Sequence, residues 1–141
     1  MLSKYGAKKT TVDGVIFDSK AEAKYYEQLK WMKANKQIKD FELQPKFLLQ
    51  EAFKKNGKTF RKIEYIADFK VINLDDTVEI VDIKGAITKE FAIKRKLFER
   101  MFLDKLILLG YDWKLGFMDW HELQKIKPKR KAKPKRMKKV R

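Results

Sequence analysis

The sequence contains no cysteine and a single histidine, His121. The lack of cysteine excludes disulfides, thiolate zinc sites and a cysteine nucleophile, and one histidine excludes multi-histidine metal sites and most histidine charge relays. Any metal here must therefore be held by oxygen ligands. The chain also has no apolar run of the roughly 18 residues that cross a membrane and no signal-peptide core after Met1. We expect no membrane association and a cytoplasmic location.

Acidic residues are the other shortage. The 19 Asp and Glu residues face 35 Lys and Arg residues, and the resulting net charge of +16 predicts attraction to a polyanion such as nucleic acid. Residues 127–141 hold ten of these cations and no acid. The length of 141 residues and the hydrophobic fraction of 44% suit one packed domain. We predict a domain over residues 1–126 and a flexible basic tail over 127–141.

Local patterns predict a chain that alternates strands and helices. Ser19 followed by Glu22 is a capping box that opens a helix, Pro45 indicates a bend or a sheet edge, and Gly110 suits a helix C-terminal cap. In chain order we predict a hairpin at residues 4–17, a helix at 20–35, one or two short strands at 38–49, a hairpin tip at 54–58, strands at 61–72 and 78–83, a helix at 89–109, a strand at 111–117 and a short helix at 119–126. This order is typical of an α/β fold with helices flanking a mixed β-sheet.

Two predicted strands carry carboxylates at positions that continue an apolar face. Alternate residues of a strand point the same way, so Asp82 and Lys84 share the face of Ile80. Asp68 shares a face with Ile66 in the preceding predicted strand. If the two strands are neighbours, the two carboxylates converge.

Each of the two longer predicted helices points a charge toward the sheet near its start. Glu22 lies on the apolar stripe that includes Leu29, and Lys94 lies on the stripe of Phe91 and Phe98. Buried charges are expected to be paired or bound to metal. The inward ionisable groups of the strands and helices therefore indicate one shared site.

Carboxylates beside a lysine fit a hard divalent cation. We predict Mg²⁺, replaceable by Mn²⁺, bound by Asp68 and Asp82 with waters and phosphate oxygens. Glu22 would bind a second metal or hold a water on the metal. Lys84 would orient or deprotonate the attacking water, or neutralise the charge developing on phosphorus. This chemistry predicts phosphodiester hydrolysis by a Mg²⁺-dependent DNA endonuclease.

The same residues resemble a known superfamily. Glu22 in a first helix, Tyr65-Ile66-Ala67-Asp68, and Asp82-Ile83-Lys84 before another helix look like the PD-(D/E)xK nuclease core. That core is the fold of many restriction enzymes, Holliday junction resolvases and transposon end-cleaving nucleases. Ala67 stands where proline is frequent, a difference that leaves the metal ligand in place. Four stretches, residues 4–9, 17–20, 42–45 and 81–85, are similar to a family of small phage-encoded proteins of unassigned function that is placed in this superfamily.

The resemblance covers residues 5–117 and implies a restriction-endonuclease-like core. The residue pattern and the resemblance together predict a catalytic set of Glu22, Asp68, Asp82, Lys84, Gln44 and Lys94. The implied metal-binding residues are Asp68, Asp82, Ile83 and Glu22. Resolvases of this kind work as paired subunits, so a homodimer is left open.

Basic side chains outside the acidic site are the expected DNA contacts. They are Lys8, Lys9, Lys54, Lys55, Lys58, Arg61, Lys89, Arg95, Lys129, Arg130, Lys131, Lys135 and Arg136.

Each site residue also has a structural alternative. Glu22 can serve only the capping box, and Asp82 and Lys84 can form a solvated ion pair. Lys94 can lay its aliphatic stem on the core with its amine in water, and Gln44 can be a turn residue.

Two function classes remain open on the sequence alone. One is the endonuclease, with branched DNA such as a junction or fork as the substrate suggested by the resemblance. The other is a non-catalytic nucleic-acid-binding protein that retains the nuclease fold and works through its basic tail and hairpin. The set Glu22, Asp68, Asp82 and Lys84 favours the enzyme, because a pure binder has no need of inward acids that repel phosphate. RNA as the substrate is not excluded.

Overall fold

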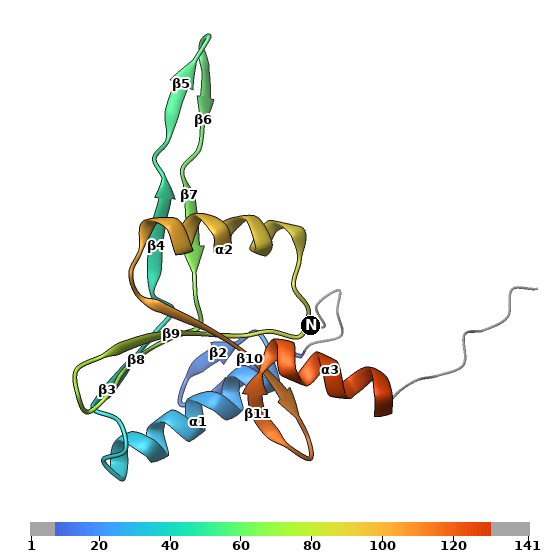
Figure 1. The fold of residues 1–141 in the computed structure, drawn as a ribbon. Coiled ribbons are helices and arrows are strands. Elements are labelled where there is room, and N and C mark those ends of the chain that lie inside the picture. Colours follow the sequence, from blue (N-terminus) through green and yellow to red (C-terminus); the bar gives the residue numbers. More distant parts are fainter. Residues whose placement is uncertain (1–7, 131–141) are drawn as a thin grey trace, which may run out of the picture.

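The computed structural model describes the backbone of residues 8–130 and the side chains of residues 8–126. Its elements are β1 (Thr10–Val12), β2 (Val15–Phe17), α1 (Lys20–Ala34), β3 (Asp40–Leu43), β4 (Lys46–Gln50), β5 (Phe53–Lys55), β6 (Lys58–Phe60), β7 (Ile63–Ile66), β8 (Phe69–Ile72), β9 (Val78–Ile83), α2 (Lys89–Met101), β10 (Lys105–Asp112), β11 (Gly116–Asp119) and α3 (Trp120–Arg130) (Figure 1). The described chain is mixed α/β, as the sequence predicts.

A five-stranded mixed sheet, with the order β11-β10-β9-β8-β3, forms the centre of the fold. β9 and β10 are parallel and are joined through α2, whereas the other neighbouring pairs are antiparallel. Alternate residues of β9 enter two different cores: Val81 and Ile83 pack with α1 and the β1–β2 hairpin, and Ile80 packs with α2. The sheet is therefore flanked by helices on both faces (Figure 1).

The predicted strand over 61–72 is two strands in the structure. β7 pairs with β4 in a separate two-stranded ribbon, and β8 joins the central sheet beside β3. The chain passes from β7 to β8 at Ala67 and Asp68. The neighbouring segment passes from β3 to β4 at Gln44 and Pro45, which confirms the bend expected at Pro45. The face shared by Asp68 and Ile66 was therefore a wrong prediction, since the strand is interrupted between them.

The predicted helix over 89–109 was too long. α2 ends at Met101, and residues expected in its last two turns form β10 between β9 and β11. The run Leu106-Ile107-Leu108-Leu109 packs into the cores on both faces of the sheet, and helix and strand both produce such a continuous apolar run. Gly110 is accordingly a strand residue. A Cβ at this position would meet Leu123 Cδ2 of α3 at 2.6 Å, so the glycine allows α3 to pack on β10.

The C-terminal helix confirms its predicted cap and corrects its predicted end. Asp119 Oδ2 accepts a 3.0 Å hydrogen bond from the amide of Glu122, but α3 continues to Arg130, past our boundary at Ile126. The predicted tail from residue 131 onward lies outside the described residues. None of the helices in residues 8–130 is long and apolar enough to cross a membrane.

Candidate functional site

Asp68 lies at the junction between the β4–β7 ribbon and the central sheet, where β7 is followed by β8. The Gln44 amide donates to the Asp68 carbonyl oxygen (2.9 Å), and the Ala67 amide donates to the Pro45 carbonyl oxygen (3.1 Å). Gln44 makes this turn with a φ of 50°, in the left-handed region that few L-residues adopt. A strained backbone conformation persists only where the surrounding structure holds it, and such conformations are frequent at functional sites.

Asp82 is buried in β9, with only 4% of its surface exposed. Tyr65 Oη donates a 2.6 Å hydrogen bond to Asp82 Oδ2, and Lys84 Nζ lies 3.3 Å from the same oxygen. The predicted shared face of Ile80, Asp82 and Lys84 is consistent with these contacts, since Ile80 and Tyr65 belong to the same core. The alternative of a solvated ion pair does not describe Asp82, because its carboxylate is inside the protein.

Asp68 and Asp82 come together as predicted. Asp68 Oδ2 accepts a 2.8 Å hydrogen bond from the Ile83 amide, one residue beyond Asp82. Burial, and then repulsion from Asp82 and Glu22, raises the pKa of Asp68 well above its ordinary value. Two neighbouring carboxylates in this environment favour a proton or a cation between them, because each charge disfavours ionisation of the other.

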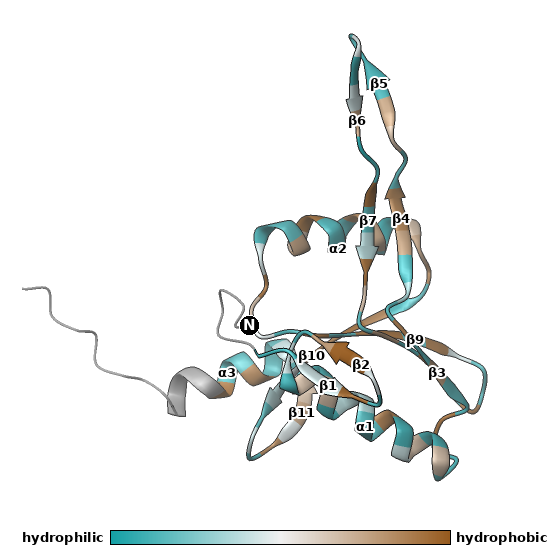
Figure 2. Cartoon of the chain, turned by 180° about the vertical axis from the view of Figure 1, so that it is seen from behind, coloured by the Kyte–Doolittle hydropathy of each residue, from teal (hydrophilic) through white to brown (hydrophobic). Residues whose placement is uncertain are grey.

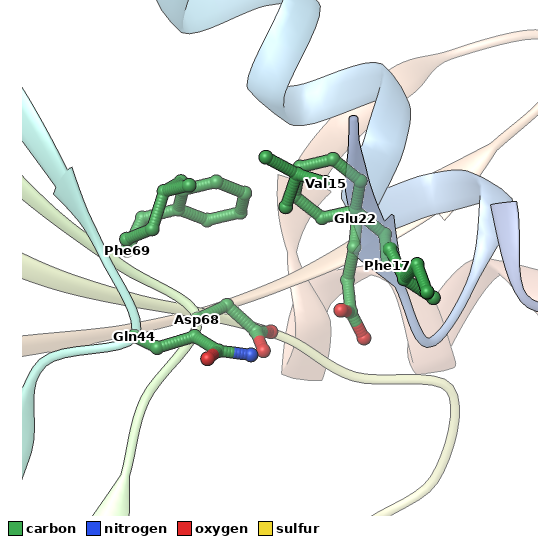
Figure 3. A pocket seen from close by; sticks show the side chains of 8 residues that line it. Val15, Phe17, Glu22, Gln44, Asp68 and Phe69 are labelled. Atoms are coloured by element: carbon green, nitrogen blue, oxygen red, sulfur yellow. The ribbon is translucent and has the colours of Figure 1, made fainter. Parts of the chain in front are cut away.

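Glu22 faces a small cavity next to this pair (Figure 3). The cavity has a volume of about 80 Å³, and its polar lining comes from Glu22, Gln44 and Asp68. The Glu22 amide donates to Ser19 Oγ (3.1 Å), so the predicted N-cap is present. Burial, and then repulsion from Asp18, raises the pKa of Glu22 to about 7. The Ser19 cap therefore uses the backbone amide of Glu22, while the Glu22 carboxylate faces the cavity.

Lys84 and Lys94 line a second, more open groove of about 290 Å³. Lys84 Nζ lies 3.7 Å from the centre of the Phe91 ring, a cation–π contact that keeps the amine beside Asp82. Lys94 Nζ lies 3.3 Å from Glu90 on the same helix. Lys94 therefore belongs to the groove, and its amine is paired away from the carboxylates.

The donor set fits a hard divalent cation. Asp68, Asp82 and Glu22 supply only oxygen, and the raised pKa values of Asp68 and Glu22 indicate that the site favours an added positive charge. Within residues 8–126, no three Asp, Glu or His side chains already stand at the spacing of a formed metal cluster. Asp68 and Asp82 would be the first two ligands, and Glu22 would approach across the cavity. Ile83 serves this site through its amide, since its side chain lies in the core.

The predicted DNA-contacting residues are dispersed over the molecule. Lys8, Lys9 and Lys89 are exposed, and Arg95 Nη1 lies 3.3 Å from His121 Nε2. The exposed residues Lys54, Lys55, Lys58 and Arg61 lie on the projecting β5–β6 hairpin. Lys129 and Arg130 lie in the last turn of α3. Lys131, Lys135 and Arg136 lie outside the described residues.

Two residues at the site were missed by the sequence analysis. Tyr65 holds Asp82, and Phe91 holds Lys84. Both looked like ordinary core aromatics in the sequence. The available signal was their position, because Tyr65 precedes Asp68 by three residues and Phe91 opens the helix that follows Lys84.

Comparison with known proteins places the chain in a family. The family described as "Protein of unknown function (DUF1064)" matches residues 2–114. No curated protein and no solved structure matches the chain. Because the match covers most of the sequence, the chain belongs to the DUF1064 family.

Proposed function

We propose that this protein is a Mg²⁺-dependent DNA endonuclease with a PD-(D/E)xK, restriction-endonuclease-like core. The observation that carries the proposal is the adjacency of the half-buried Asp68 carboxyl group to the buried Asp82 carboxyl group, with Lys84 3.3 Å from the latter. A protein that only binds nucleic acid gains nothing from buried acids that repel phosphate. A phosphodiester hydrolase needs them to hold a cation at the scissile group.

The roles of the residues follow from their surroundings. Asp68 and Asp82 would hold the ion, while Tyr65 keeps the Asp82 carboxylate oriented. A divalent cation at this site would polarise the phosphodiester and acidify a bound water. Lys84 would stabilise the charge developing on phosphorus or take the proton of the attacking water, because Phe91 and Asp82 fix its amine next to the pair.

Glu22 and Gln44 would act from the cavity side. The Glu22 carboxylate, with a pKa raised to about 7, can accept a proton from a water near the ion or approach a second ion. The side-chain amide of Gln44 lies at the same cavity and can hydrogen-bond a water there (Figure 3). Lys94 would contact phosphate in the groove, so we propose a binding role for it.

The charge of the chain supports DNA as the substrate. A net charge of +16 and exposed lysines on several elements attract a polyanion, and a location with access to DNA, such as the cytoplasm, suits this activity. If both strands of a branched DNA are cut, a homodimer would supply the second active site.

A cleavage panel tests the proposal. Linear duplex, single-stranded, flap and four-way-junction DNA, and matching RNA strands, are incubated with the full chain and Mg²⁺, Mn²⁺ or EDTA. The proposal predicts cleavage of at least one DNA with either metal and none with EDTA. Cleavage that persists in EDTA, or no cleavage of any DNA, would contradict it.

A further inference from the structure

A β-hairpin arm, defined as residues 51–62, projects from the body of the protein (Figure 1). β5 and β6 pair antiparallel, and Asn56 (φ 53°) and Gly57 (φ 74°) form the tight turn at the tip. Every residue of the arm is exposed, so no core holds it. An isolated two-stranded hairpin is marginally stable at best, so contact with a partner would add stability that the arm lacks on its own.

One face of the arm combines two aromatic rings with two lysines. Phe53 and Phe60 are cross-strand partners whose rings stack 4.9 Å apart at 13°, and they remain 44% and 38% exposed. Lys55 pairs across the strands with Lys58 on the same face. Lys58 Nζ also lies 5.3 Å from the centre of the Phe60 ring. Apolar ring surface is thus presented together with positive charge.

The charge of the arm selects the kind of partner. It carries five cations and one acid, and its tip is hydrophilic (Figure 2). Among the described residues, only Lys62 of these cations has an ion-pair partner, Glu64 at 3.4 Å. A second copy of the arm would bring lysines against lysines, so self-association is disfavoured. Nucleic acid offers the complementary chemistry of phosphates and base rings.

The aromatic pair further selects unpaired nucleotides over duplex. Bases within a duplex already stack on one another, so their faces are not available to the Phe53 and Phe60 rings. Binding to duplex phosphates would use only the lysines. Unpaired bases expose their ring faces, and stacking of such bases on aromatic side chains is the general mode of single-strand binding. The exposed Phe53 and Phe60 rings provide such a surface.

The arm is connected to the candidate site by a short path. Phe60 and Asp68 are eight residues apart along one bent ribbon, which at about 3.3 Å per residue spans at most roughly 26 Å. The groove that contains Lys84 and Lys94 is also lined by Tyr65 and Ile66 of β7. Glu64 and Glu90 also line the groove, where they pair with Lys62 and Lys94. A strand stacked on the arm would follow this groove toward Asp82, which Lys84 contacts.

We propose that the arm binds unpaired nucleotides by stacking them on Phe53 and Phe60, and that the substrate is DNA with a single-stranded segment close to the cut. This inference rests on the proposed function and adds the substrate class. The reach of roughly 26 Å corresponds to at most about eight nucleotides at the duplex rise of 3.4 Å, and to fewer in an extended single strand. Cleavage should therefore fall within about eight nucleotides of the unpaired segment.

Binding measured without cleavage tests the arm separately from the nuclease. Fluorescence anisotropy in EDTA compares the full wild-type chain with three variants: F53L/F60L, which keeps apolar cross-strand partners but loses the rings; F53Y/F60Y, which keeps the rings; and K54Q/K55Q/K58Q. The probes are an oligo-dT single strand, a blunt duplex, and the same duplex with a single-stranded overhang.

We expect F53L/F60L to bind the single strand and the tailed duplex about tenfold or more weakly, and the blunt duplex as wild type does. F53Y/F60Y should bind all three probes like wild type. K54Q/K55Q/K58Q should reduce the salt slope on the single strand by about 2, whereas F53L/F60L should leave it unchanged.

Three results would overturn the inference. They are an equal loss on blunt duplex, no loss on any probe with F53L/F60L, and a change from dimer to monomer in that variant by sedimentation. Because these measurements are made in EDTA, the arm can pass the test in a protein that cuts nothing. Conversely, a nuclease whose F53L/F60L variant binds normally would retain the proposed function and lose only this inference.

Discussion

Tyr65 Oη donates a 2.6 Å hydrogen bond to Asp82 Oδ2 inside the core, which makes an aromatic packing residue the support of a candidate metal ligand. Burial, and then the charge of Asp82, raises the pKa of Tyr65, so the phenol remains a donor. The ring also contacts Phe47, Phe91 and Phe98, which fix its position.

Tyr65→Phe removes this hydrogen bond and keeps the ring. The buried Asp82 loses a donor, so we expect the free energy of unfolding to fall by about 1–3 kcal/mol. The Mg²⁺ concentration for half-maximal cleavage should rise by about 10–100-fold, because the ligand is less well oriented. Chemical denaturation and a metal titration of cleavage measure the two effects. An unchanged metal dependence would assign Tyr65 to packing alone.

Lys84→Ala should slow the chemical step by on the order of 10² or more while metal binding persists. The Lys84 amine contacts Asp82 and the Phe91 ring, but it is not a candidate metal ligand. Metal binding should therefore persist, because the carboxylate ligands remain. Single-turnover cleavage and calorimetric metal titration separate the two properties. Lys39→Ala is the matched control, since Lys39 is exposed and pairs with Asp76. Equal cleavage rates in the two variants would remove Lys84 from the mechanism.

Glu22→Gln separates the cap from the site. Gln keeps the backbone amide that donates to Ser19 Oγ, so we expect little change in stability, much lower activity and a higher Mg²⁺ requirement. Ser19→Ala is the complementary variant: it removes the acceptor of the Glu22 amide and should cost about 1 kcal/mol while the folded protein stays active. Full activity of Glu22→Gln would leave the site to Asp68, Asp82 and Lys84.

The metal-free protein should lose stability as the pH rises. Glu22 and Asp68 have raised pKa values in the folded state, so the folded form holds more protons than the unfolded form from the ordinary carboxyl pKa near 4 up to about 7 for Glu22, and to a higher pH for Asp68. In EDTA, we expect the melting temperature to fall from about pH 5 upward, with both groups contributing up to about pH 7 and Asp68 alone above it. Mg²⁺ should restore it most at the higher pH.

Asp68→Asn should flatten this decline, because a neutral side chain replaces the group whose proton is lost. Asp75→Asn is the control, since Asp75 is exposed and its hydrogen bonds to Thr77 lower its pKa. Melting curves over pH with EDTA or Mg²⁺ measure the effect. A melting temperature that rises with pH in EDTA would contradict the described environment of the carboxylates.

Local chemistry made much of this fold predictable. The Asp13-Gly14 and Asn56-Gly57 turns, the Ser19 cap and the strand that contains Asp82 all follow from signals within a few residues. β10 was not predictable in this way, because a run buried on both faces has no strand periodicity. The interruption at Asp68 depends on Gln44 and Pro45 about 24 residues earlier, so only tertiary pairing reveals it.

The sequence was sufficient to predict which carboxylates face the candidate site, but not which side chains contact them. The face of Asp82 follows from strand alternation, and the inward side of Glu22 follows from helix spacing. The contacts of Tyr65 and Phe91 depend on how the ribbon and α2 pack on the sheet. Lys94 pairs with Glu90, one helical turn away, and this pair competes with the predicted approach of Lys94 to the carboxylates. The apolar stripe alone does not reveal that pair.

Single-turnover cleavage by Asp82→Asn tests the central claim most directly. The substrate is the DNA that wild type cuts best, and Glu42→Gln, an exposed acid on β3, is the matched control. We predict Mg²⁺-dependent cleavage by wild type and Glu42→Gln, and a rate about 10² or more lower for Asp82→Asn with equal or tighter DNA binding. Near-wild-type Mg²⁺-dependent cleavage by Asp82→Asn would contradict the assignment of Asp68 and Asp82 as the catalytic metal site.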